Sequence, residues 1–176
     1  MKIKIIMISL LFYGMAYGVS AQDYSELDKI LLKDKADCSS NEGLVLECSN
    51  YLLDSPIDAI DEDPNHMKAL QFVMRWMEAT PDYSFVLDES MELASGPNPS
   101  LLGVLLASMA KYALENKTDD EEDVKYNAFI TFINYCEEPK HNVTLTREIK
   151  DLIKAKNENS LKEYLKINRN VIITRI

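Results

Sequence analysis

The chain has 176 residues, of which 29 are acidic and 19 are basic, so its formal net charge at pH 7 is −10. This charge argues against nucleic acid or anionic lipid as a partner, because both are bound through clustered lysine and arginine. Five glycines are too few and too scattered for the phosphate-binding loops of dinucleotide or P-loop enzymes. We therefore expect no nucleic-acid partner and no cofactor.

The first part of the chain, residues 1–21, has the pattern of a signal peptide. Two lysines precede an apolar run over residues 5–15, and small residues follow as far as Ala21. The apolar run is too short to span a membrane as a permanent anchor. We expect cleavage after Ala21, export to the periplasm or secretion, and one helical domain over residues 22–176 with no membrane anchor. Without the leader the net charge is −12, because the leader carries two basic residues and no acidic one.

Helical spacing of apolar residues dominates the rest of the chain. In order, the predicted helices cover residues 24–35, 39–52, 64–79, 83–94, 99–116, 118–136, 146–156 and 160–166. The second and sixth begin at capping boxes, formed by Ser39 with Glu42 and by Thr118 with Glu121. Pro64 and Pro99 mark first helical turns, where the missing N–H costs nothing. The helix from Pro99 is apolar nearly all round at its start and is expected to lie at the centre.

The spacing of the helices leaves two arrangements open. Pro64 and Pro99 are 35 residues apart, close to the period of tetratricopeptide repeats, but the residue pattern of those repeats is absent. We predict an all-α fold of seven or eight helices, either an irregular bundle or a tetratricopeptide-like layer of helical hairpins. The end of the chain is rich in β-branched residues from Val171 to Ile176, and residues 170–176 are predicted as a strand or a tail.

Charge is unevenly distributed between the two parts of the helical domain. Residues 22–139 carry a net charge of −17, and residues 140–176 carry +5. Because opposite charges attract, we expect the C-terminal helices to dock on the acidic body rather than to seek an acidic partner.

Three cysteines, Cys38, Cys48 and Cys136, follow the predicted leader. An exported protein enters an oxidising compartment, so one disulfide and one free thiol is the expected arrangement. The spacing does not choose between the pairs, and three reduced thiols remain an alternative.

Acidic residues near His66 form a weak candidate metal site. Asp61 and Asp63 precede this histidine at the start of a predicted helix, and carboxylate and imidazole groups can bind metal ions. However, the helix dipole favours acids at a helix N-terminus without any metal. The same two interpretations, a cation site or a solvated helix start, apply to the acidic run at residues 119–123. We therefore assign no metal site.

No catalytic signature occurs in the chain. The serine-hydrolase and zinc-protease motifs are missing, and Cys136 with His141 lacks a third group that would orient the pair. We assign no catalytic residue. A small exported hydrolase that uses acidic residues stays as an alternative.

An aromatic and methionine stripe includes Phe72, Trp76 and Tyr83. Such a stripe is more often part of the core, but an exposed part of it would form an interaction surface for a helix or peptide.

Three segments, Ala69–Phe85, Phe132–Pro139 and Leu161–Leu165, resemble small exported proteins of Bacteroidetes that have no assigned activity. The resemblance implies a helical, exported protein and supplies no site residues. We hypothesise a non-enzymatic protein that binds another protein or a peptide, with an acidic divalent-cation-binding protein as a further alternative.

Overall fold

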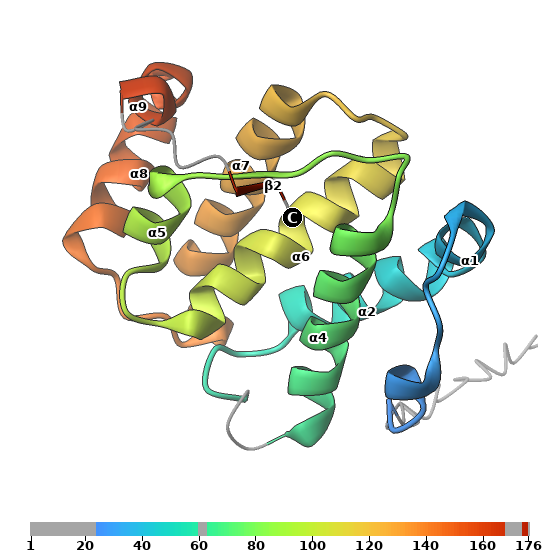
Figure 1. Cartoon of the computed structure of the whole chain (residues 1–176). Helices are drawn as coiled ribbons and strands as arrows, with labels where there is room; N and C mark the ends of the chain where they lie inside the picture. Colours follow the sequence, from blue (N-terminus) through green and yellow to red (C-terminus); the bar gives the residue numbers. More distant parts are fainter. Residues whose placement is uncertain (1–23, 60–62, 168–173, 176) are drawn as a thin grey trace, which may run out of the picture.

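The computed structural model describes residues 24–59, 63–167 and 174–175. The predicted signal peptide lies outside these residues. Within these described residues the fold is all-α, with 72% helix in eight α-helices, as the sequence predicts, and one pair of two-residue strands (Figure 1). The helices are α1 (Lys35–Ser40), α2 (Glu42–Asp54), α4 (Pro64–Ala79), α5 (Glu89–Ser95), α6 (Pro99–Asn116), α7 (Glu121–Glu137), α8 (Arg147–Asn157) and α9 (Leu161–Ile167).

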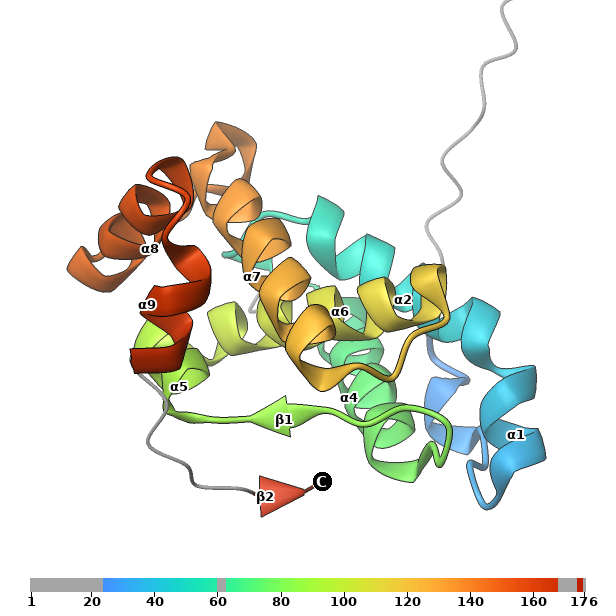
Figure 2. The ribbon, with the colours of Figure 1, turned by 90° about the horizontal axis from the view of Figure 1, so that it is seen from above.

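Helix α6 forms the centre of the fold. It contacts α2, α4, α5 and α7, and the two views show these helices around it (Figures 1 and 2). Most of its residues from Leu101 to Leu114 are buried. α2 packs on α6 as closely as α7 does, although α4 and α5 lie between α2 and α6 in the sequence, so helices from distant parts of the chain meet at α6.

Polar caps and prolines begin the long helices. The side chain of Asp63 accepts a hydrogen bond from the Asn65 N–H at 2.9 Å, ahead of Pro64. Asn98 accepts from the Ser100 N–H at 2.9 Å, ahead of Pro99. These caps satisfy N–H groups that have no partner inside the helix, and both predicted starts are confirmed. The two predicted capping boxes are wrong: Ser39 lies inside α1 and Asn41 precedes α2, and α7 is capped by Asp120 rather than Thr118.

The predicted helix over residues 24–35 is wrong. The chain forms only a 3-10 turn, η1 (Leu27–Lys29), and then runs without regular structure to Asp34, which caps α1. The guanidinium of Arg75 on α4 donates to the Leu27 carbonyl at 2.7 Å and to the Ile30 carbonyl at 3.2 Å. These tertiary hydrogen bonds use carbonyl groups that a continuous helix would need for itself.

The predicted helix over residues 83–94 begins later than expected. Residues 86–87 form strand β1 (Val86–Leu87), and α5 begins only at Glu89, behind its cap Asp88. β1 pairs in antiparallel register with β2 (Thr174–Arg175), so that Val86 is opposite Arg175 and Leu87 is opposite Thr174 (Figure 2). β2 lies within the segment predicted as a strand or tail.

The C-terminal helices dock on the acidic body, as the charge distribution predicts. Both α8 and α9 contact α7, and Lys156 of α8 forms an ion pair with Glu137 of α7 at 2.7 Å. None of the helices in the described ranges is long and apolar enough to cross a membrane.

Candidate functional site

A buried ion pair joins the first half of α7 to the start of α5. Lys125 Nζ lies 2.5 Å from Asp88 Oδ2, and the two side chains are 5% and 2% exposed. The other carboxylate oxygen of Asp88 accepts hydrogen bonds from the Ser90 N–H at 3.1 Å and the Ser90 hydroxyl at 2.5 Å. Burial opposes the ionisation of Asp88, but the hydrogen bonds from Lys125 and Ser90 outweigh it and hold its pKa below the usual value.

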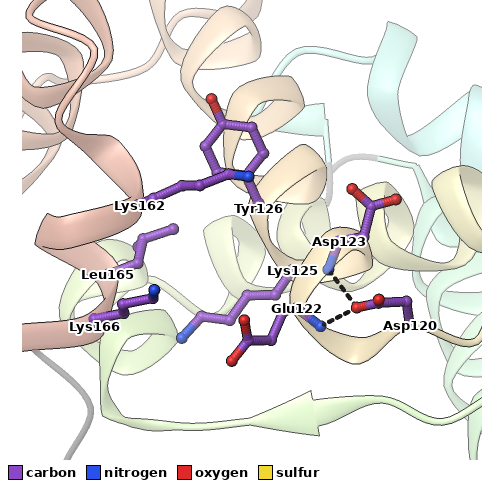
Figure 3. Close-up of a pocket in the computed structure, with 8 residues that line it drawn as sticks. All are labelled: Asp120, Glu122, Asp123, Lys125, Tyr126, Lys162, Leu165 and Lys166. Carbon is purple, nitrogen blue, oxygen red and sulfur yellow. Dashed lines mark hydrogen bonds between the residues drawn. The ribbon is translucent and has the colours of Figure 1, made fainter.

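Lys125 also lines a cavity of about 340 Å³ between α7 and α9 (Figure 3). Cavities of this size hold small molecules or a few residues of a peptide. The lining residues come from the start of α7 and from α9, and they are Asp120, Glu122, Asp123, Lys125, Tyr126, Lys162, Leu165 and Lys166. The site therefore brings together two segments that are about 40 residues apart in the chain.

The α9 side of this cavity is basic. Lys162 Nζ lies 4.8 Å from the centroid of the Tyr126 ring, close enough for a cation–π interaction. Among the described residues, neither Lys162 nor Lys166 forms an ion pair with an acidic side chain. Leu165, between them in the sequence, is almost fully buried and lines this side of the cavity with its remaining apolar surface. This side can attract a negatively charged group and pack against an apolar one.

The α7 side of the cavity is acidic and well ordered by hydrogen bonds. Asp120 caps α7 by accepting from the Glu122 N–H at 3.1 Å and the Asp123 N–H at 3.0 Å (Figure 3). Asp123 in turn accepts from the Tyr112 hydroxyl at 2.8 Å. These contacts agree with the interpretation of the acidic run as a helix start, and they fix carboxylates opposite the lysines. The cavity thus has an acidic wall on the α7 side and a basic wall on the α9 side.

A second, mostly apolar cavity of about 430 Å³ lies beside β1 and α5. Asp88 is in its wall, whereas Lys125 is in the wall of the first cavity. Its other lining residues belong to β1, α5, the following turn and the start of α6, and they include Leu87, Met91, Pro97 and Leu102. The ion pair therefore fixes the boundary between two cavities of different character.

The candidate metal residues do not form a metal site within the described part of the chain. Asp63 accepts a hydrogen bond from the Tyr51 hydroxyl and caps α4, and Asp61 lies outside the described residues. His66 is buried, and neither ring nitrogen makes a well-formed hydrogen bond. In the segments that are described, no group of three or more His, Cys, Asp or Glu side chains could hold a metal ion.

All three cysteines are free, buried thiols, so the structure contains none of the candidate disulfides. Burial raises the pKa of Cys48 and of Cys136 to about 12, and it also raises the pKa of Cys38. Thiols with such pKa values remain protonated at neutral pH and are poor nucleophiles. The structure therefore gives Cys136 no activated thiolate.

His141 lies in the turn after α7 and has a structural role. It is buried, its ring stacks on Tyr135 at 3.8 Å, and its Nδ1 lies 2.9 Å from the Tyr135 carbonyl oxygen. The backbone carbonyl of His141 also accepts from the Ile57 N–H at 2.9 Å. His141 therefore holds the loop after α2 against the end of α7.

The candidate interaction surface is part of the core. Phe72 and Trp76 are fully buried, and Tyr83 is half-buried with its ring 5.5 Å from that of Trp76. Trp76 Nε1 donates to the Cys38 carbonyl at 3.0 Å. These three residues of the stripe therefore belong to the core and do not form an exposed interaction surface. Helical periodicity alone does not single out the α9 lysines, Lys162 and Lys166, as site residues, although the basic bias of residues 140–176 is a signal for them.

Comparison with protein-family models, curated proteins and solved structures finds no match for the chain.

Proposed function

We propose that this protein is an exported, non-enzymatic peptide-binding protein, and that the cavity between α7 and α9 is its binding site. The observation that carries the proposal is the placement of a basic wall and an acidic wall around one cavity of about 340 Å³. A peptide is the class of ligand that offers both charges, an apolar side chain and hydrogen-bonding groups within such a volume. The signal-peptide pattern of residues 1–21 supports the export of the protein.

Each wall has a distinct role in this proposal. Lys162 and Lys166 receive a carboxylate of the peptide, and Asp120 or Asp123 receives an ammonium or guanidinium group. Tyr126 and Leu165 contact an apolar side chain between them. Complementary charge gives specificity and orientation more than affinity, so the proposed ligand is a peptide with an acidic and a basic group at a fixed spacing.

The proposal is tested by capture of peptides from a random hexapeptide library on the immobilised protein, read by mass spectrometry. We expect enriched peptides to carry both an acidic and a basic residue. Two exposed ion contacts contribute about 1–2 kcal/mol together, so the double variant Lys162→Glu/Lys166→Glu should bind these peptides about tenfold more weakly.

A matched control has the same change in charge away from the cavity. Lys33 and Lys150 are exposed and form no ion pair with another described residue, so Lys33→Glu/Lys150→Glu should bind like the wild type. If no peptide is enriched, or if both double variants lose binding equally, the cavity is not a peptide site.

A further inference from the structure

The apolar cavity of about 430 Å³ beside α5 has no part in the proposed peptide site. Its volume lies within the range of small-molecule sites, about 300–1,000 Å³. The apolar residues that line it are Leu87, Met91, Pro97, Pro99 and Leu102, and none of the described lining residues is aromatic. Burial of apolar surface is favourable, and a lining without rings suits an alkyl chain. The cavity is therefore shaped for a ligand with an aliphatic body.

The charged residues around this cavity are all acidic. Its described lining includes three carboxylates and no lysine, arginine or histidine. The charge of Asp88 is balanced by Lys125. Glu89 is half-buried and Glu92 is exposed, and neither forms an ion pair with a basic side chain in the described part of the chain. Residues three apart on a helix are neighbours on one face, so one cation can contact both.

Several hydrogen-bond donors at the cavity already have partners, whereas these two carboxylates can still accept. Pro99, the first residue of α6, has no N–H, and the next N–H, of Ser100, donates to the Asn98 side chain at 2.9 Å. The Ser95 hydroxyl donates to the Glu92 carbonyl at 3.3 Å. Ionised carboxylates only accept hydrogen bonds. The polar part of a ligand here must therefore donate hydrogen bonds, and a positive charge suits it best.

We propose that this cavity binds a small aliphatic amine in its ammonium form. The alkyl chain lies against Leu87 and Leu102, and the ammonium group lies between Glu89 and Glu92. Hydrogen bonds in which both partners are charged are stronger than neutral ones, so the head group orients the ligand. This second site goes beyond the proposed peptide binding, because it lies in another cavity and takes a ligand without an anionic group.

The test compares three ligands that share a six-carbon chain and differ only in the head group. Hexylammonium, 1-hexanol and hexanoate are titrated into the isotopically labelled full chain at pH 7, and methyl NMR signals are followed. We expect hexylammonium to bind with a Kd on the order of millimolar, as its few atoms allow, and about tenfold more tightly than hexanol. Hexanoate should bind more weakly than hexanol. Signals of Leu87 and Leu102 should shift, and those of the exposed Met67 and Met74 should not.

A double variant removes the charge and keeps the shape of the two side chains. Glu89→Gln/Glu92→Gln should bind hexylammonium about tenfold more weakly than the wild type. Its binding of hexanol should be unchanged, which shows that the apolar part of the cavity is intact. The matched control is Glu78→Gln/Glu138→Gln, because both of these glutamates are exposed and away from the cavity lining. This control should bind all three ligands like the wild type.

Three results would each overturn the proposal. The first is that Leu87 and Leu102 show no shift with hexylammonium up to tens of millimolar, on the scale of weak fragment binding. The second is that hexanol or hexanoate binds as tightly as hexylammonium, which would mean that the carboxylates do not select the head group. The third is that the two double variants lose hexylammonium binding equally, which would mean that overall charge rather than this site attracts the cation.

Discussion

Lys125 and Asp88 are 37 residues apart in sequence and form an ion pair from which water is almost fully excluded. Lys125 Nζ also lies 5.9 Å from the centroid of the Phe129 ring. Removing two charges from water costs several kcal/mol, and their attraction offsets this only when the geometry is good. The pair therefore does more to fix the start of α5 against α7 than to stabilise the fold.

Loss of one partner of this pair should be strongly destabilising. Lys125→Met removes the ammonium group that donates to the buried Asp88 carboxylate, and we expect the free energy of unfolding to fall by about 3–5 kcal/mol. Lys125→Met/Asp88→Asn, which retains a capping side chain at position 88, should recover a large part of this loss. Urea unfolding measures both. A single variant within about 0.5 kcal/mol of the wild type would show that the pair is not buried in solution.

Two methionines on α4 provide a matched test of which face of this helix is in the core. Met77 is buried, whereas Met74 is 43% exposed. We expect Met77→Ala to reduce the free energy of unfolding by about 2–5 kcal/mol and Met74→Ala to change it by less than about 0.5 kcal/mol. Fluorescence of the single tryptophan, Trp76, reports unfolding. Equal effects of the two substitutions would contradict the orientation of α4.

His66 should make the protein less stable in mild acid. Burial lowers the pKa of this side chain in the folded protein, and the nearby Asp63 opposes the shift only in part. In the unfolded chain the imidazole titrates near its usual pKa of 6.5. The unfolded state therefore binds more protons below this pH, and the free energy of unfolding decreases as the pH falls through it.

The variant His66→Phe isolates this effect, because it keeps a ring beside Tyr51 and removes the titrating group. Between about pH 7 and pH 5.5, above the range in which carboxylates dominate, its free energy of unfolding should depend less on pH than that of the wild type. Urea unfolding at several pH values measures the slope. Identical slopes would mean that His66 does not titrate with an altered pKa.

The buried thiols should be unreactive in the folded protein. Since burial raises the pKa of Cys48 and Cys136 to about 12 and also raises that of Cys38, iodoacetamide at pH 8 should label none of them before unfolding and all three in denaturant. The melting temperature should be the same with and without reducing agent. A lower melting temperature with reductant would reveal a disulfide and contradict the free thiols.

Local signals in the sequence were sufficient for the long helices. The starts of α4 and α6 depend on an Asp-Pro and an Asn-Pro pair, which act within a few residues of the chain. The extended segment before α5 was not predictable in this way. It depends on pairing with β2 and on the contact of Asp88 with Lys125, both made with distant residues. The turn at Leu27 likewise depends on Arg75.

In the candidate site, too, some features were predictable from the local sequence and others depend on contacts between distant residues. The acidic run at residues 119–123 and the basic bias of the C-terminal part could be read from the sequence. That Lys162 would lie over Tyr126, and that Lys125 would be buried rather than solvated, follows only from how α9 and α5 pack on α7. Periodicity places a side chain on a helix face, but it does not tell which distant element covers that face.

The most direct test of the proposed function is to map where a captured peptide binds. The most strongly enriched hexapeptide is titrated into the isotopically labelled protein, and methyl and aromatic NMR signals are followed. We predict shifts at Tyr126 and Leu165, with none at Met67 and Met74, which are exposed on α4. Shifts at Met67 and Met74 with unchanged signals at Tyr126 and Leu165 would contradict a binding site between α7 and α9.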